Sequence, residues 1–488
     1  MNANPPPPQF GRVALRGGLV TAGAQGFKIA IQFLSVVILA RLLVPEDFGL
    51  VASVGPIVAF VGLLQDLGLQ QAVIQRKEID QRQLNQVFWL SAVVGLCAGA
   101  VVACLAPAIV AFYGDQRMWG ITLASAVPLL FGSLAAVPLA LMNRHLQFGQ
   151  LALNDTITAA VGLLATATAA YWGLGYWSLV LGPAVSAVVA LAAGWLVTRW
   201  TPSWPNLKID GDIFRFGANL TGFNLVNFLS RNLDNILIGK YSGAVELGYY
   251  DRAYKLLLFP LQNINQPLTR IMVPLLSRIH EDKQRFRDIY VRTNWLLAVI
   301  TMPGIATLTL TSEQVVRLLF GERWMAVAPI FAWLGIAGLM QSVSSTTGWI
   351  FICQGKTKTM FHWGIYSSLT TVASFIVGLH WGAIGVAAAY AISGYALRVP
   401  VLAALIHRVG PVTAGDFLGI QGLFIVSSLL AWLSYLSLPA LLTSQSDLLT
   451  ILVAIALNYG FALALMLAVP QSRRALLATL ANVASNIG

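Results

Sequence analysis

The feature that most constrains this chain is a series of apolar runs, each about 20 residues long, that extends from Gly17 to Pro470. Runs of this length cross a bilayer as helices, whereas a membrane β-barrel would show shorter segments of alternating polarity. Composition agrees, because 57% of the residues are hydrophobic and only 10% are charged. We therefore predict an all-α polytopic membrane protein with about fourteen transmembrane helices.

The predicted spans follow one another along almost the whole chain. They cover residues 17–40, 48–72, 85–111, 119–142, 151–172, 175–198, 216–239, 249–274, 290–311, 325–353, 361–379, 382–405, 417–438 and 448–470. The Pro-rich start, MNANPPPPQFGR, lacks the features of a removable signal peptide, so we expect the first helix to direct insertion.

The net charge of +11 is explained by membrane topology rather than by nucleic-acid binding. If the N-terminus is placed inside, most of the 30 Lys and Arg residues fall in connections on the inner side. This bias predicts that both termini are cytoplasmic and that the protein attracts anionic lipids. We expect no nucleic-acid partner.

Metal binding is not indicated by the Cys and His residues. The three cysteines lack CxxC spacing, and no HxxxH or HExxH motif brings two of the five histidines onto one helix face. We expect free thiols, no metal site and no cofactor.

The chain contains an internal repeat. When it is shifted against itself by 199 residues, Arg16 lies on Arg215 and Gly49 lies on Gly248. Further matches follow at slightly larger offsets: FYGD at 112–115 over LFGE at 319–322, and WGLGYWSLVLG at 172–182 over WGAIGVAAAY at 381–390. Each matched pair is separated by an even number of helices, so we predict two six-helix lobes related by a pseudo-twofold axis along the membrane normal. The predicted divisions are lobes at 1–200 and 208–408, and two additional helices with a cytoplasmic tail at 409–488.

Both copies of the repeat carry polar residues in their first helix. Positions spaced by 3, 4 and 3 residues lie within an arc of about 80° on a helix, and here they form one narrow stripe in each copy. The stripes are Gln25, Lys28, Gln32 and Ser35 in the first copy, and Asn224, Asn227, Arg231 and Asp234 in the second.

A charge at the bilayer centre costs about 2.5–3.5 kcal/mol, so these stripes should face protein or a wet cavity. One alternative is that Arg231 and Asp234 simply pair with each other. That pairing leaves Lys28 with no acidic residue on its own helix nearby, so we favour a substrate-binding cavity lined by both stripes. Asp234 and Asp66 are candidates for coupling transport to a proton or a sodium ion.

Two other polar groups could belong to the same cavity or could serve packing. The run QSVSSTT at 341–347 lies in a predicted span, where helix packing is an equally good explanation. Asp251, Arg252 and Lys255 lie at the predicted outer end of another span, where we expect a solvated cluster.

Several stretches of the chain resemble one family. These are ILARLLVPEDFGLVA at 38–52, QAVIQRKEID at 71–80, DNILIGKYSGAVELGYYDRAY at 234–254 and FGERW at 320–324. They resemble the bacterial polysaccharide exporters, or lipid-linked oligosaccharide flippases, of the multidrug/oligosaccharidyl-lipid/polysaccharide superfamily, and most closely the O-antigen and colanic-acid-type exporters.

The resemblance implies a function as well as a fold. It implies two lobes around a cationic cavity in the bacterial inner membrane, and movement of a polyprenyl-pyrophosphate-linked oligosaccharide from the cytoplasmic to the periplasmic leaflet by alternating access. The expected partners are membrane lipid, this substrate and polysaccharide-assembly proteins. The family offers no catalytic motif to transfer, so the candidate residues rest on the polar stripes, and we expect a transporter rather than an enzyme.

Three alternatives stay open at this point. A membrane-embedded glycosyltransferase or polymerase would need placed acids and bases in a sizeable outer loop, and the outer connections are short. A drug/cation antiporter favours an acidic cavity, whereas Lys28 and Arg231 outnumber Asp234 in the stripes. A lipid II flippase belongs to the same superfamily, but the quoted stretches resemble the exporters more closely.

Overall fold

The computed structural model describes residues 7–65, 70, 73–74, 79–203, 228, 232–437, 446–474 and 476–477, with the backbone alone for 7–22 and 64–65. The chain forms two compact units, Met1–Gly248 and Tyr249–Gly488. The predicted lobe limits stay a prediction, because residues 204–208 at the predicted boundary lie outside the described residues.

The first unit consists of long helices together with the helical residues 232–241. Its helices are α1 (Pro7–Leu42), α2 (Pro45–Gln65), α4 (Gln81–Tyr113), α5 (Arg117–Arg144), α6 (Phe148–Tyr171) and α7 (Tyr176–Thr198). A further helix begins in this unit and continues into the second; it is α9 (Gly243–Arg278).

The second unit contains more helices, several of them short. They are α10 (Lys283–Leu310), α11 (Ser312–Leu319), α12 (Val327–Ser344), α13 (Thr347–Cys353), α14 (Thr357–Gly378), α15 (Gly382–Ser393), α16 (Val399–Val409), α17 (Ala414–Leu436) and α19 (Asp447–Ala468). Short 3-10 turns occupy η1 (Glu322–Trp324) and η2 (Leu379–Trp381), and a π-helix, η3 (Gly394–Arg398), joins α15 to α16.

The predicted all-α membrane fold is confirmed. Within the described ranges there is no strand, and 11 helical stretches are long and apolar enough to cross a membrane. Three differences explain why these 11 stretches are fewer than the fourteen predicted spans. The span 216–239 lies mostly outside the described residues, 249–274 falls in the more polar α9, and 361–379 joins 382–405 in one continuous stretch, Thr357–Val409.

Helix ends follow from local sequence. Asp80 caps α4, since its carboxylate accepts a hydrogen bond from the Gln83 amide at 2.7 Å while the Gln83 side chain accepts one from the Asp80 amide. The same helix ends at Gly114, which adopts φ 81°. A glycine is favoured there because a Cβ atom disfavours the left-handed region.

The internal repeat is visible in the loops. Gly114 of FYGD and Gly321 of LFGE both have positive φ, 81° and 92°. Gly173 and Gly382, each the second residue of its matched WG pair, also have positive φ, 80° and 65°. The matched glycines thus share positive φ, although their ψ angles differ, 16° at Gly114 and 173° at Gly321.

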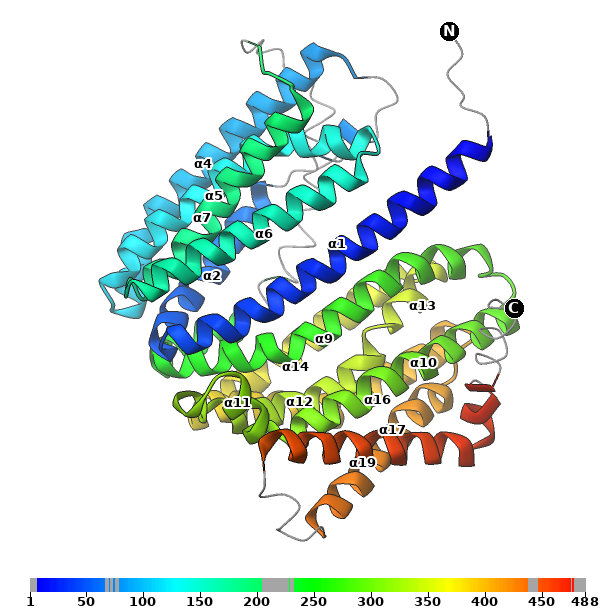
Figure 1. Ribbon diagram of the computed structural model, residues 1–488. Coiled ribbons are helices and arrows are strands. Elements are labelled where there is room, and N and C mark those ends of the chain that lie inside the picture. The colour runs from blue at the N-terminus through cyan, green and yellow to red at the C-terminus, as the bar shows by residue number, and fades with distance from the viewer. Residues whose placement is uncertain are drawn as a thin grey trace. The chain divides into compact units, whose positions relative to one another are not determined.

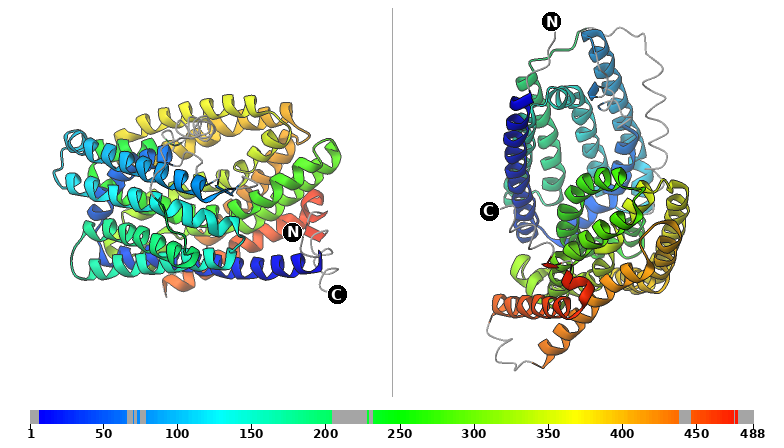
Figure 2. Two further views of the ribbon diagram at one scale, coloured as in Figure 1. Left: turned by 90° about the horizontal axis from the view of Figure 1, so that it is seen from above. Right: turned by 90° about the vertical axis from the view of Figure 1, so that its right-hand side faces the viewer.

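Helix neighbours repeat as well. In the first unit α4 packs on α5, α5 on α7 and α7 on α6, and these helices lie side by side (Figures 1 and 2). In the second unit the equivalent helices pack in the same order, α10 on α12, α12 on α15 and α15 on α14. The same sequence of contacts in both units is what two copies of one ancestral bundle should show.

A close backbone contact joins the first turn of α2 to residues 244–248, all within the first unit. A methyl group on Gly49 would lie 1.6 Å from the Ala244 carbonyl oxygen, and one on Gly248 would lie 1.9 Å from the Pro45 carbonyl oxygen. The 199-residue shift turns one contact into the other, because it maps Gly49 onto Gly248 and Pro45 onto Ala244. The two close contacts therefore correspond to each other under the internal repeat.

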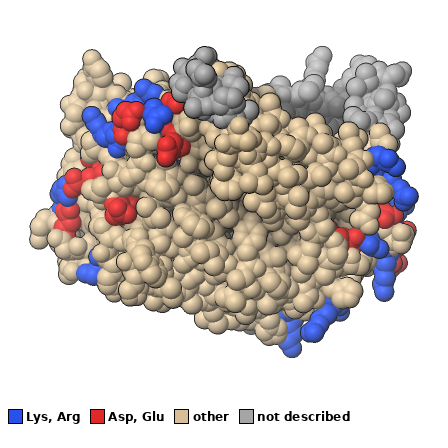
Figure 3. All heavy atoms as spheres, turned by 90° about the horizontal axis from the view of Figure 1, so that it is seen from below, with Lys and Arg blue, Asp and Glu red and all other residues tan. Residues whose placement is uncertain are grey.

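Charged side chains are unevenly distributed over the surface. On the face drawn in Figure 3, they gather towards the margins and leave a broad uncharged area between them. Such an area matches the hydrocarbon part of a bilayer, because a lipid-facing charge is costly. The chain is therefore a multi-pass membrane protein, as predicted.

Candidate functional site

The polar stripe of the first copy lies on α1. Gln25 and Gln32 are exposed, whereas Lys28 and Ser35 are half-buried. The Lys28 side chain forms an ion pair across to α6, with its Nζ 2.9 Å from the Asp155 Oδ2. Helix α6 packs along α1, so the two charges are held by neighbouring helices rather than by adjacent turns of one helix.

Asp155 is the functional candidate that the sequence reasoning missed. It is an acidic residue inside the predicted span 151–172, and that was the available signal. The pair is open to its surroundings, since the side chains of Lys28 and Asp155 are 30% and 47% exposed. The first stripe is therefore less cationic than expected, because a carboxylate from another helix balances Lys28.

Polar atoms without partners lie next to this pair. Among the described residues, Asn154 Oδ1 and Thr158 Oγ1 on α6 are buried without a hydrogen-bond partner. Buried polar groups are almost always hydrogen-bonded, to water or a ligand where protein supplies no partner. Both residues are close to Asp155 in sequence, one position before it and three after it, and each of the two oxygens is enclosed by protein.

The second stripe can be followed only in part. Asn224, Asn227 and Arg231 lie outside the described residues, so the predicted pairing of Arg231 with Asp234 stays a prediction. Asp234 itself is buried, with 3% of its surface exposed, and its Oδ1 accepts a hydrogen bond from the Asn235 amide at 2.8 Å. The other ion-coupling candidate, Asp66, also lies outside the described residues.

The run at 341–347 is used for helix packing. Thr346 donates to Asn294 Oδ1 at 2.7 Å and is hydrogen-bonded to the Tyr290 hydroxyl at 2.9 Å. Asn265 donates to Ser345 at 3.0 Å. These bonds join α9, α10 and the end of α12 inside the second unit, in keeping with the packing explanation.

The cluster near the start of α9 differs from its prediction. Asp251 and Arg252 are buried, at 7% and 5% exposure, so the expected solvated cluster is wrong. The Asp251 carboxylate lies 2.7 Å from Arg252 Nη2 and 3.0 Å from Lys255 Nζ. This arrangement satisfies a carboxylate inside the protein, where an unpaired charge would be costly.

A second buried cation lies in the second unit. Arg398 is 6% exposed, and its guanidinium lies 4.1 Å from the centroid of the Tyr390 ring. It donates to Thr371 Oγ1 and to the Tyr390 carbonyl oxygen, both at 2.5 Å. Within the described ranges it forms no ion pair, so hydroxyl, carbonyl and aromatic groups carry its charge.

The cysteines and histidines form no cluster. Over the part of the chain that the structure describes, no group of three or more His, Cys, Asp or Glu residues could hold a metal ion. All three cysteines are free, with Cys97 and Cys104 exposed and Cys353 buried.

Comparison with known proteins identifies the family. Residues 38–329 match the model of a family described as polysaccharide biosynthesis protein. This chain belongs to that family. The resemblance seen in the sequence is thereby confirmed.

Individual relatives agree with the family. The chain is similar to lipopolysaccharide biosynthesis protein WzxC of Escherichia coli (strain K12), with 27% identity over 86% of this chain and 84% of the relative. It is also similar to succinoglycan biosynthesis transport protein ExoT of Rhizobium meliloti (strain 1021), with 24% identity over 71% of each chain.

Among solved structures, the fold is similar to that of lipid II flippase MurJ in an inward closed conformation. The TM-score is 0.69 at 15% identity, and the match covers 91% of this chain and 98% of that one. At this identity the similarity bears on the fold alone.

Proposed function

We propose that the protein carries a polyprenyl-pyrophosphate-linked oligosaccharide, a repeat unit of lipopolysaccharide or exopolysaccharide, from the cytoplasmic to the periplasmic leaflet of a bacterial inner membrane. The names of its relatives describe polysaccharide biosynthesis and, for ExoT, transport. They favour a transporter over a membrane-embedded glycosyltransferase or polymerase. The bias of basic residues supports cytoplasmic termini.

The observation that carries the proposal is the Lys28–Asp155 ion pair. It lies within apolar helices, joins α1 to α6, and is neither fully buried nor solvated. A pair placed for stability alone gains little in such a setting, because exposed ion pairs contribute about 0–1 kcal/mol. A lysine that must bind and release an anion needs this accessibility together with a counterion for the unloaded state.

The pair suggests how the anionic headgroup is held. A pyrophosphate cannot enter hydrocarbon unaided, because its charges would lose their hydration. In the proposed cycle the pyrophosphate competes with Asp155 for Lys28, while the sugars lie against the polar groups beside the pair and the polyprenyl tail stays in lipid.

The same exchange offers a route for ion coupling. When a substrate anion takes Lys28, the Asp155 carboxylate loses its partner and becomes a site for a proton or a sodium ion. Asp155 therefore joins Asp234 and Asp66 as a coupling candidate, and it is the one whose cationic partner the structure describes.

Transport is tested with the purified full-length chain in proteoliposomes. Polyprenyl-pyrophosphate-linked oligosaccharide is placed in one leaflet, and its appearance in the other is followed with a membrane-impermeant glycosidase. We expect protein-dependent transfer, which Lys28→Gln slows at least about tenfold, because a hydrogen bond to a charged group contributes about 1.5–3 kcal/mol. Arg117→Gln, which removes a cation paired with Glu46 and Asp115 outside the stripe, is the matched control.

Two results would contradict the proposal. One is transfer no faster than in protein-free vesicles. The other is lengthening of the glycan without any change of leaflet, which would show an enzyme instead.

A further inference from the structure

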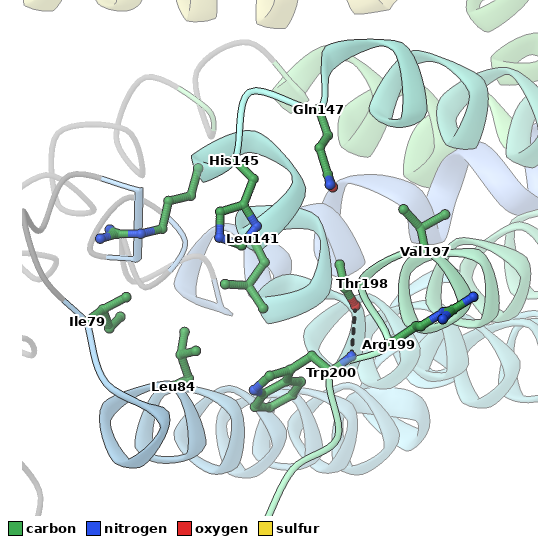
Figure 4. A pocket seen from close by; sticks show the side chains of 10 residues that line it. Ile79, Leu84, Leu141, His145, Gln147, Val197, Thr198, Arg199 and Trp200 are labelled. Atoms are coloured by element: carbon green, nitrogen blue, oxygen red, sulfur yellow. Dashed lines mark hydrogen bonds between the residues drawn. The ribbon is translucent and has the colours of Figure 1, made fainter. Parts of the chain in front are cut away.

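A pocket of about 370 Å³ lies in the first unit, and neither Lys28 nor Asp155 lines it. It is formed where α4 begins, α5 ends and α7 ends (Figure 4). By the predicted topology these ends face the cytoplasm, so the pocket lies at the level of the inner lipid headgroups.

The pocket has an apolar floor that is part of a packed core. Leu84 and Leu141 are buried members of one hydrophobic cluster, and the ring of Trp200 packs against this cluster. Trp200 also meets Phe88 edge to face, with the ring centroids 5.4 Å apart. The floor is therefore preformed, which lowers the entropic cost of binding a ligand.

Hydrogen bonds fix the segment that forms one wall. After α7 the chain runs back over the start of α4, where Trp200 Nε1 donates to Gln81 Oε1 at 3.0 Å. The Ser203 amide donates to Asn85 Oδ1 at 3.0 Å, and Trp89 Nε1 donates to the Ser203 carbonyl oxygen at 2.8 Å. The wall is thus held to α4 by three side chains.

The polar part of the lining is basic. Arg144, His145 and Arg199 contribute to it, and none of the ten lining residues is acidic. Arg144 Nη1 donates to the Val73 carbonyl oxygen at 2.8 Å, which anchors that arginine. His145 and Arg199 are exposed and form no ion pair with another described residue.

We propose that this pocket binds the phosphate-bearing headgroup of an anionic phospholipid. Basic residues that line a pocket beside a hydrophobic cluster match an amphiphile with a phosphate and a glycerol–acyl part, whereas a soluble anion would gain nothing from Leu84 and Leu141. Gln147 and Thr198, which face the same space in Figure 4, add uncharged groups that can hydrogen-bond to phosphate or glycerol oxygens. The site would tie the inner end of this bundle to anionic lipid.

The test compares lipid binding by the wild type and a His145→Gln/Arg199→Gln double variant. Both residues are exposed, so the variant should fold, and its thermal stability in neutral detergent should match the wild type. Phosphatidylglycerol, phosphatidylcholine and inorganic phosphate are titrated separately against the purified full-length protein, and bound molecules are counted by native mass spectrometry. The charge-matched control is Arg117→Gln, at the start of α5, the opposite end of that helix from Arg144.

We expect phosphatidylglycerol to bind about fivefold more weakly to the double variant, because the Arg199 charge is lost, with weak phosphatidylcholine binding unchanged. Inorganic phosphate at millimolar concentration should not displace the lipid. Equal weakening by Arg117→Gln would show general charge attraction and overturn the proposal. Unchanged lipid binding in the double variant, or loss of inorganic phosphate binding alone, would overturn it too.

Discussion

Two pairs of equivalent positions in the internal repeat behave differently. Gly49 and Gly248 make reciprocal contacts with the carbonyl oxygens of Ala244 and Pro45. A methyl group added to either glycine would lie at nearly the same distance from the facing oxygen. Ser35 and Asp234 are also equivalent, yet Ser35 is half-buried whereas Asp234 is 3% exposed. The backbone contacts thus correspond in the two copies, whereas burial differs at the stripe position that is described in both.

The difference separates two kinds of constraint. Close backbone approach admits only glycine, so both copies must retain it for the two segments to pack. A polar side chain in a membrane helix is instead constrained by the residues, water or ligand that it faces. Lys28 faces an acidic residue of α6, and an asymmetric substrate gives the two copies no reason to keep the same stripe.

The largest effect is expected at the glycine contact. Gly49→Ala and Gly248→Ala should each destabilise the fold by about 3 kcal/mol, because a methyl group would overlap a backbone carbonyl that cannot rotate away. Thermal unfolding in detergent and the yield of inserted protein measure it. Gly26→Ala, which meets nothing within 4 Å, is the control. A clear loss in only one of the two variants would break the symmetry of the contact.

The next prediction tests whether the Lys28–Asp155 ion pair serves transport or only stability. Exchanging the charges in a Lys28→Asp/Asp155→Lys double variant should keep the ion pair and leave stability within about 1 kcal/mol of wild type. Transport should still fall about tenfold, because the cation then lies on α6 instead of α1. Proteoliposome transfer rates and thermal unfolding separate the two quantities. Full recovery of transport in the exchanged variant would show that the pair is only structural.

A smaller effect compares the acids of the two copies. Asp234→Asn should cost about 1–3 kcal/mol of stability, since the carboxylate is buried and hydrogen-bonded. Asp155→Asn should cost less than about 1 kcal/mol, since Asp155 is 47% exposed. Matched thermal unfolding curves test this order. Equal losses would mean that exposure does not determine how much these two carboxylates contribute to stability.

The smallest effect is a pH dependence at the loop between α4 and α5. The hydrogen bond from the Arg117 side chain lowers the pKa of Asp115 below its ordinary value of 3.8. A lowered pKa in the folded state means that Asp115 contributes stability above about pH 4 and that this contribution is lost as the pH falls through the lowered pKa. The loss should be under about 1 kcal/mol, because the pair is partly exposed. Unfolding curves between pH 6 and pH 3 should differ in slope between wild type and Asp115→Asn.

Much of the architecture could be predicted because it depends on local pattern. Long apolar runs require helices in a membrane, and the glycines in the matched loops FYGD and LFGE both take positive φ. The polar position of Lys28 could be found for the same reason, since an ionisable residue in an apolar run stands out. The family followed from short stretches that survive divergence, and it is confirmed by the match over residues 38–329.

Other features depend on which helices become neighbours. Asp155 is 127 residues from Lys28, and only the packing of α6 on α1 shows that the two charges meet. Asp251 and Arg252 were predicted to be solvated from their place at a helix end, but burial depends on the surrounding helices. The basic pocket likewise brings together three separate connections of the first unit.

The sequence by itself determined that the chain crosses a membrane many times, that it contains a repeat, and that ionisable residues lie inside its spans. Hydrophobicity, turn chemistry and the cost of burying charge are properties of short segments, and they can be read along the chain. The packing of the helices was needed to show that Lys28 has a carboxylate partner, that Gly49 and Gly248 make reciprocal contacts, and that Arg144 and Arg199 line one pocket. Those facts depend on distances between segments far apart in the chain, which periodicity along a helix does not encode.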